Sequence, residues 1–83
     1  MKKEDVIKII KAEQLVSYSF FEERADSSDE VVIKNETDRW IVYATNERAS
    51  KISEGERVFD NEGDALDSFI RRLRALNRYR NNI

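Results

Sequence analysis

The chain has 83 residues, enough for one small hydrophobic core, so we expect a single domain over residues 1–83. It contains no cysteine and no histidine, which excludes disulfides, thiolate metal sites and histidine-dependent nucleophilic catalysis. Its two glycines lie far apart, so no phosphate-binding loop is present. This composition favours a binding protein over an enzyme, and we expect no cofactor and no metal.

The net charge of −2 conceals an uneven distribution along the chain. Residues 13–64 carry fourteen acidic and six basic side chains, a net charge of −8, whereas the two flanks together carry +6. An acidic middle can attract a basic partner and speed its encounter with the protein. The same pattern is also that of an ordinary solvated, charge-rich surface.

No apolar run approaches the roughly 20 residues that a membrane helix requires. The first residues lead into an amphipathic pattern rather than the apolar stretch of a signal peptide. We therefore expect a soluble, cytoplasmic protein that has no membrane partner.

The first predicted element is a helix over residues 3–14, because Val6, Ile7 and Ile10 form an apolar stripe flanked by lysines. In residues 15–21, aromatic and aliphatic side chains alternate with serines, and this period of two predicts a strand.

The middle of the chain predicts a small sheet. A polar turn over residues 25–29 precedes a strand at 31–34, and residues 35–38 form a short hairpin connection. Residues 39–45 are apolar on both faces and are expected to form the central strand. Residues 57–59 are compatible with a fourth strand, which the sequence leaves open.

A final helix is predicted after Asn61, an N-cap residue that is followed by acids suited to the positive end of the helix dipole. Its apolar stripe runs from Leu66 to Leu76, and residues 77–83 are expected to fray. The order is α-β-β-β-(β)-α. We predict a two-layer α+β domain with an antiparallel meander sheet and both helices packed on one face.

The only side chains that could carry out acid–base catalysis or hold a cation are carboxylate pairs such as Glu22–Glu23 and Asp29–Glu30. None of these pairs has the spacing of a calcium loop. The arginines between Arg71 and Arg80 could bind phosphate, but a solvated helix face explains them more simply. Because the chain is acidic overall, we expect no nucleic-acid partner.

A tryptophan strand (Trp40 to Tyr43) is followed by the turn Asn46-Glu47-Arg48-Ala49, then by Val58-Phe59 and an acidic helix start from Glu62. With the lysine- and glutamate-rich opening helix, this pattern resembles the small immunity proteins of bacterial polymorphic toxin systems, in particular the immunity protein 59 family. Ala49, where many relatives carry glycine, and Gly63 inside the helix start depart from the family pattern.

The resemblance implies a protein that binds and neutralises a cognate toxin of the same bacterium and is not an enzyme. The alternatives are an acidic inhibitor that mimics nucleic acid, for example one carried by a phage, to block a DNA-binding enzyme, or an enzyme with a carboxylate site. We expect a monomer or weak homodimer. The candidate partner-binding residues are the charged side chains of the acidic middle: Glu22, Glu23, Asp26, Asp29, Glu30, Glu36, Asp38, Glu47, Arg48, Glu54 and Glu56.

Overall fold

Two helices and four strands follow one another in residues 1–81, the part of the chain that the computed structural model describes. This order confirms the predicted α+β class, and the segment left open by the sequence is a fourth strand. The elements are α1 (Lys3–Glu13), β1 (Tyr18–Phe20), β2 (Val31–Glu36), β3 (Arg39–Ala44), a 3-10 turn η1 (Ser53–Gly55), β4 (Arg57–Phe59) and α2 (Glu62–Asn81).

The strands lie in the order β1-β2-β3-β4, so neighbours in the chain are neighbours in the sheet. β3 is antiparallel to both β2 and β4, as expected for the central strand. β1, however, runs parallel to β2, with Tyr18 opposite Val31. The prediction of a wholly antiparallel meander is therefore wrong for this pair. The connection over residues 21–30 is long enough to cross the sheet and return the chain to the same end, which a tight hairpin turn cannot do.

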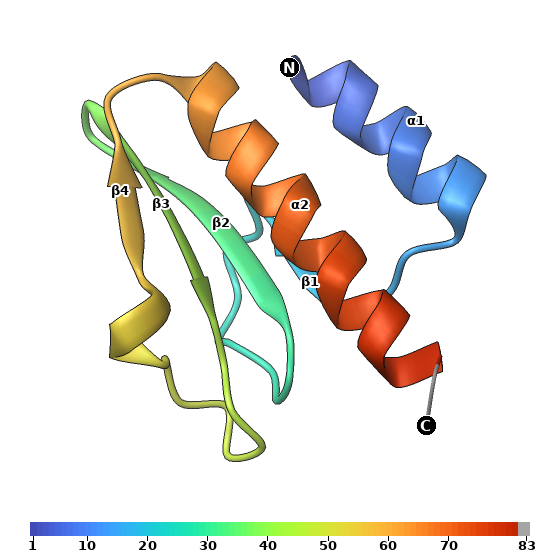
Figure 1. Ribbon diagram of the computed structural model, residues 1–83. Helices are drawn as coiled ribbons and strands as arrows, with labels where there is room; N and C mark the ends of the chain where they lie inside the picture. The colour runs from blue at the N-terminus through green and yellow to red at the C-terminus, as the bar shows by residue number, and fades with distance from the viewer. Residues whose placement is uncertain (82–83) are drawn as a thin grey trace.

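The helices form a second layer on one face of the sheet, as predicted. α2 packs against β2, β3 and β4, and α1 lies next to α2 (Figure 1). Burying one face of the sheet and one stripe of each helix removes apolar surface from water, which is the main favourable contribution to folding. The core consists of side chains from both layers: Val6, Ile10, Leu15, Val31, Ile33, Val42, Ala65, Leu66, Phe69, Ile70 and Leu73.

The first half of the chain differs from its predicted pattern in two details. β1 is shorter than residues 15–21 because Ser17 and Phe21, on either side of it, adopt left-handed φ values of 68° and 55°. These turns end the extended backbone that a strand requires. In α1, Ile7 is 42% exposed instead of joining the apolar stripe, and Ile9 is partly buried against the core.

The two ends of α2 are held by asparagines. Asn61 Oδ1 accepts the Asp64 N–H at 2.8 Å, so the predicted N-cap is confirmed. The expected fraying from Asn77 is wrong for residues 77–81, which remain helical; residues 82 and 83 of that prediction lie outside the described part. Asn77 is only 7% exposed, and it exchanges hydrogen bonds with the Val16 backbone, which ties this end of the helix to the chain before β1. None of the helices within residues 1–81 has the length and apolarity needed to cross a bilayer.

Candidate protein-binding surface

The sheet face away from the helices, which we call the open face, carries the candidate Glu36, and the other candidates lie in the segments that connect the strands. Cross-strand partners in the observed register share a side of the sheet, and side chains alternate along each strand. Because Ile33 and Val42 point into the core, their neighbours point the other way. The open face therefore consists of Val32, Lys34, Glu36, Arg39, Ile41, Tyr43 and Val58.

The segment that connects β1 to β2, residues 21–30, covers part of the open face. Val32 is fully buried and Tyr43 is only 6% exposed, although neither faces the helices. The Tyr43 hydroxyl donates a 2.7 Å hydrogen bond to Asp26 Oδ2 in this segment. Burial, together with the bond to the Asp26 carboxylate and its charge, raises the pKa of Tyr43. Tyr43 therefore remains a neutral donor and holds the segment to the sheet.

Arg24 organises the inside of the covering segment. Its guanidinium donates to both Glu30 oxygens, at 2.8 and 3.2 Å, and to Glu22 Oε1 at 3.0 Å. Glu30 is 3% exposed and also accepts the Ser27 N–H at 2.8 Å. A buried carboxylate needs such partners because leaving water is costly for a charge. Glu30 was predicted as a partner contact, but the structure places it as an internal anchor.

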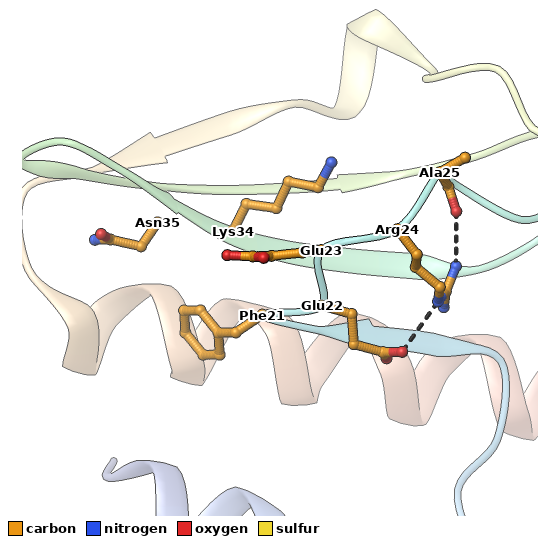
Figure 2. A pocket seen from close by; sticks show the side chains of 7 residues that line it. All are labelled: Phe21, Glu22, Glu23, Arg24, Ala25, Lys34 and Asn35. Atoms are coloured by element: carbon orange, nitrogen blue, oxygen red, sulfur yellow. Dashed lines mark hydrogen bonds and ion pairs between the residues drawn. The ribbon is translucent and has the colours of Figure 1, made fainter.

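A hollow of about 510 Å³ lies beside the covering segment, between it and the end of β2 (Figure 2). Arg24 donates to Glu22 on one side, whereas Glu23 points away from Arg24. The bond from Arg24 and a second from the Phe20 N–H lower the pKa of Glu22. Glu22 is therefore engaged within the segment, while Glu23 is exposed and has no ion pair in the described structure.

A second hollow, of about 440 Å³, lies at the hairpin end of the open face. Glu36, Asp38 and Arg39 surround Ile41 and Val58 there. Val58 is 51% exposed, so it adds accessible apolar surface at this end of the open face. Neither acid forms an ion pair within residues 1–81. Val58 was not among the residues predicted from the sequence. The alternation along Arg57-Val58-Phe59 could have indicated it, because it places Val58 and Phe59 on different faces of the sheet.

Glu56 lies directly before β4, toward the end of β3 that is away from the hairpin, and is held by a cation. Lys51 Nζ is 2.7 Å from Glu56 Oε2, and it also lies 5.4 Å from the centre of the Tyr43 ring. The Glu56 bond raises the pKa of Lys51, so the ammonium stays charged. Glu54, in η1, is exposed. Lys51 therefore links the turn after β3 to the open face.

Three further candidates also lie at the end of β3 that is away from the hairpin. Asp29, Glu47 and Arg48 line a hollow of about 470 Å³ together with Ile52. Asn46 Oδ1 shapes this turn by accepting the N–H groups of Arg48 and Ser50. The six residues of β3 span roughly 17 Å, so these residues and the hairpin-end group do not form one small patch.

The candidate carboxylates can accept hydrogen bonds and form ion pairs with basic groups. Within residues 1–81, no three acidic side chains converge into a group that could hold a metal ion. Arg24 lowers the pKa of Glu22, which lines the hollow beside the covering segment. A lowered pKa keeps a carboxylate charged at neutral pH, which suits an ion pair with a basic partner.

The fold and this surface define a small α+β domain that presents a partly covered sheet face, with acids around an apolar centre. The chain belongs to the immunity protein 59 family, whose model matches residues 2–83. The resemblance seen in the sequence is thereby confirmed. No curated protein and no solved structure matches the chain.

Proposed function

We propose that this protein is an immunity protein that binds a cognate bacterial toxin and occludes its active or binding surface. Membership of the immunity protein 59 family over residues 2–83 carries this proposal. The protein acts by binding in the cytoplasm of the toxin-producing cell, without catalysis.

The hairpin end of the open face is the surface we assign to the toxin. Binding energy in protein interfaces is concentrated in a few apolar or aromatic anchors surrounded by a polar rim. Ile41 and Val58 supply an accessible apolar centre, and Glu36 and Asp38 supply rim charges that are not neutralised within the described chain. This arrangement suits a basic toxin surface, such as that of a nuclease active site.

The distribution of charge favours binding of a toxin at this surface over the alternative function, mimicry of a nucleic acid. A mimic requires a row of acids at phosphate-like spacing on one face. Here the acids are divided among the covering segment, the hairpin end and the turn after β3. Lys34, Arg39 and Lys51 interrupt them. The lowered pKa of Glu22 likewise offers no support for acid–base catalysis by the carboxylates beside the covering segment.

Co-expression tests the function. The toxin-like gene adjacent to the gene for this protein is expressed with and without it, and growth and complex formation are measured. We expect growth rescue and a stable complex on size-exclusion chromatography. Absence of both would overturn the proposal.

Matched variants test the surface. Val58→Arg places a charge at the apolar centre, and it should weaken toxin binding by about 30-fold or more, the factor for losing a hot spot of ~2 kcal/mol. Ile7→Arg is the control, because Ile7 is similarly exposed but lies on α1. Calorimetry that shows equal affinities for the two variants would exclude the hairpin end as the contact surface.

A further inference from the structure

Three arginines from two elements converge on the helix side of the sheet, at the edge formed by β4. Arg57 comes from the start of β4, and Arg71 and Arg72 come from α2. With Ser68 and Gly55 they line a hollow of about 260 Å³. Arg57 is opposite Val42, which points into the core, so this hollow lies on the other side of the sheet from the open face.

Backbone carbonyls hold two of these arginines in place. Arg72 Nη1 donates to the Val42 carbonyl at 3.2 Å. Arg57 Nη1 donates to the carbonyls of Glu54 and Glu56 at 3.3 and 2.9 Å. Each guanidinium carries five N–H donors, so these bonds orient the groups and leave further donors available.

No carboxylate neutralises this cluster in the part of the chain that the structure describes. Arg74, also on α2, forms an ion pair with Glu13 instead, and this pair lies on the side of α2 that faces α1. Burial, followed by the positive charges of Arg57 and Arg71, lowers the pKa of Arg72. Three cations kept together in an acidic protein repel one another, and a bound anion would relieve that repulsion.

Gly55 lies against the end of the Arg72 side chain. A Cβ atom at this position would lie 3.0 Å from Arg72 Nη2, at the limit of steric overlap. The small residue therefore leaves space for the guanidinium at the floor of the hollow. Ser68 is 3% exposed and adds a hydroxyl beside it.

We propose that Arg57, Arg71, Arg72 and Ser68 form a binding site for one phosphate group, either free phosphate or the phosphate of a small ester. The guanidinium fork matches phosphate oxygens in charge and geometry, and bonds between ionised partners are the strongest hydrogen bonds in proteins. A continuous track for a nucleic-acid backbone is not formed, because Arg74 is paired with Glu13 and Arg80 donates to Ser17.

Titration of the 15N-labelled full chain with inorganic phosphate tests the site, with chloride at equal ionic strength as the reference. We expect saturable amide shifts around Arg57, Ser68 and Arg72 in phosphate but not in chloride. The melting temperature should also rise with phosphate concentration, because a ligand that binds only the folded state stabilises it. Absence of saturable shifts would overturn the proposal.

Arg71→Gln is the informative variant, since Arg71 is exposed and its loss should not affect folding. It should weaken phosphate binding by about tenfold, the factor for one charge-assisted hydrogen bond. Arg78→Gln removes the same charge about 10 Å further along α2 and should leave the affinity unchanged. Equal affinities of the two variants would show diffuse charge attraction and overturn the site.

A nucleoside monophosphate distinguishes the two sources of the phosphate group. Shifts at the same residues with at least tenfold tighter binding would assign the site to a phosphate ester. Equal or weaker binding would assign it to free phosphate. The site is independent of the toxin-binding proposal, because it is tested without a toxin and lies on the opposite side of the sheet.

Discussion

Asn77 shows how one buried polar side chain extends a secondary-structure element. Its amide accepts the Val16 N–H at 2.9 Å and donates to the carbonyls of Val16 and Leu73 at 3.0 and 2.8 Å. The loop before β1 has no strand partner at Val16, and Asn77 supplies the bonds that a strand would give. In the sequence, an asparagine at this position predicts the end of a helix. The Val16 backbone, which it bonds, lies 61 residues away and is not part of the local pattern.

Asn77→Ala should destabilise the protein by about 1–3 kcal/mol, because it leaves the Val16 N–H and carbonyl partly buried without partners. Urea unfolding followed by circular dichroism measures this loss. Asn81→Ala, at an exposed position of the same helix, should change stability by less than about 0.5 kcal/mol. Equal effects of the two substitutions would show that the side-chain bridge contributes nothing.

At the scale of elements, the covering segment acts as an irregular third layer over part of the open face. It contains no helix or strand, so its polar groups must be satisfied by side chains. Arg24, Glu30 and Thr45 provide most of these bonds. The Thr45 hydroxyl accepts the Glu30 N–H at 3.0 Å and donates to the Ser27 carbonyl. These contacts fix where Glu22, Glu23 and Asp26 lie on the surface.

Arg24→Ala should destabilise the protein by about 1–3 kcal/mol, because it leaves Glu30 as a buried carboxylate with fewer donors. The value is below the 3–5 kcal/mol of fully buried pairs, since the Arg24 side chain is 35% exposed. Adding Glu30→Gln to Arg24→Ala should recover part of the loss, because the double variant buries no charge. Chemical denaturation of Arg24→Ala, Glu30→Gln and the double variant completes the cycle. If Arg24→Ala were as stable as Arg39→Ala, this prediction would be wrong.

The contact of α1 with α2 predicts a pH dependence. Arg74 Nε donates to both Glu13 carboxylate oxygens at 3.0 and 3.1 Å, and this bond lowers the pKa of Glu13 below its usual 4.5. Near and below pH 4.5 the unfolded chain therefore binds the proton more readily than the folded one. The stabilisation is present above that pH and is lost as the pH falls through the lower pKa of the folded state.

Melting temperatures of the wild type and of Glu13→Gln, measured from pH 7 to pH 3, test this dependence. The wild type should be the more stable above pH 4.5, and the difference should shrink in acid. Glu47→Gln, in an exposed turn, serves as the control. A constant difference between wild type and Glu13→Gln across the range would exclude the linkage.

At the scale of the whole molecule, the sequence predicts most of the elements and the core, but it does not predict the direction of β1. Periodicities of two and 3.6 residues are local, so the helices and the β2–β3 hairpin could be predicted from them, whereas β4 is too short for its pattern to decide. The direction of β1 depends on contacts of residues 21–30 with β2 and β3. The bond between Tyr43 and Asp26 that holds this segment joins residues 17 positions apart, and no periodic pattern encodes it.

The candidate surface could be predicted only in part. Charge density correctly pointed to the middle of the chain as the location of exposed acids such as Glu36 and Asp38. It could not show that Glu30 is buried or that Val58 is exposed, because both depend on which side of the sheet is covered. The arginine cluster was also hidden, since Arg57 lies 14 positions before Arg71.

The lengths of the edge strands predict how the protein behaves at high concentration. β1 and β4 form the two edges of the sheet, and each is three residues long. Sedimentation velocity from micromolar to millimolar protein should give the mass of one chain throughout. A concentration-dependent dimer that persists in high salt would contradict this expectation.

Short edges also govern how such a domain can change over evolutionary time. A long edge strand is a template on which other chains can add, so substitutions near it risk aggregation. In this sheet the long strands β2 and β3 are both internal and pair with each other along their whole length, so neither of them is an edge strand. Solvent-facing side chains of β2 and β3 can therefore vary to follow a changing partner without lengthening either edge strand.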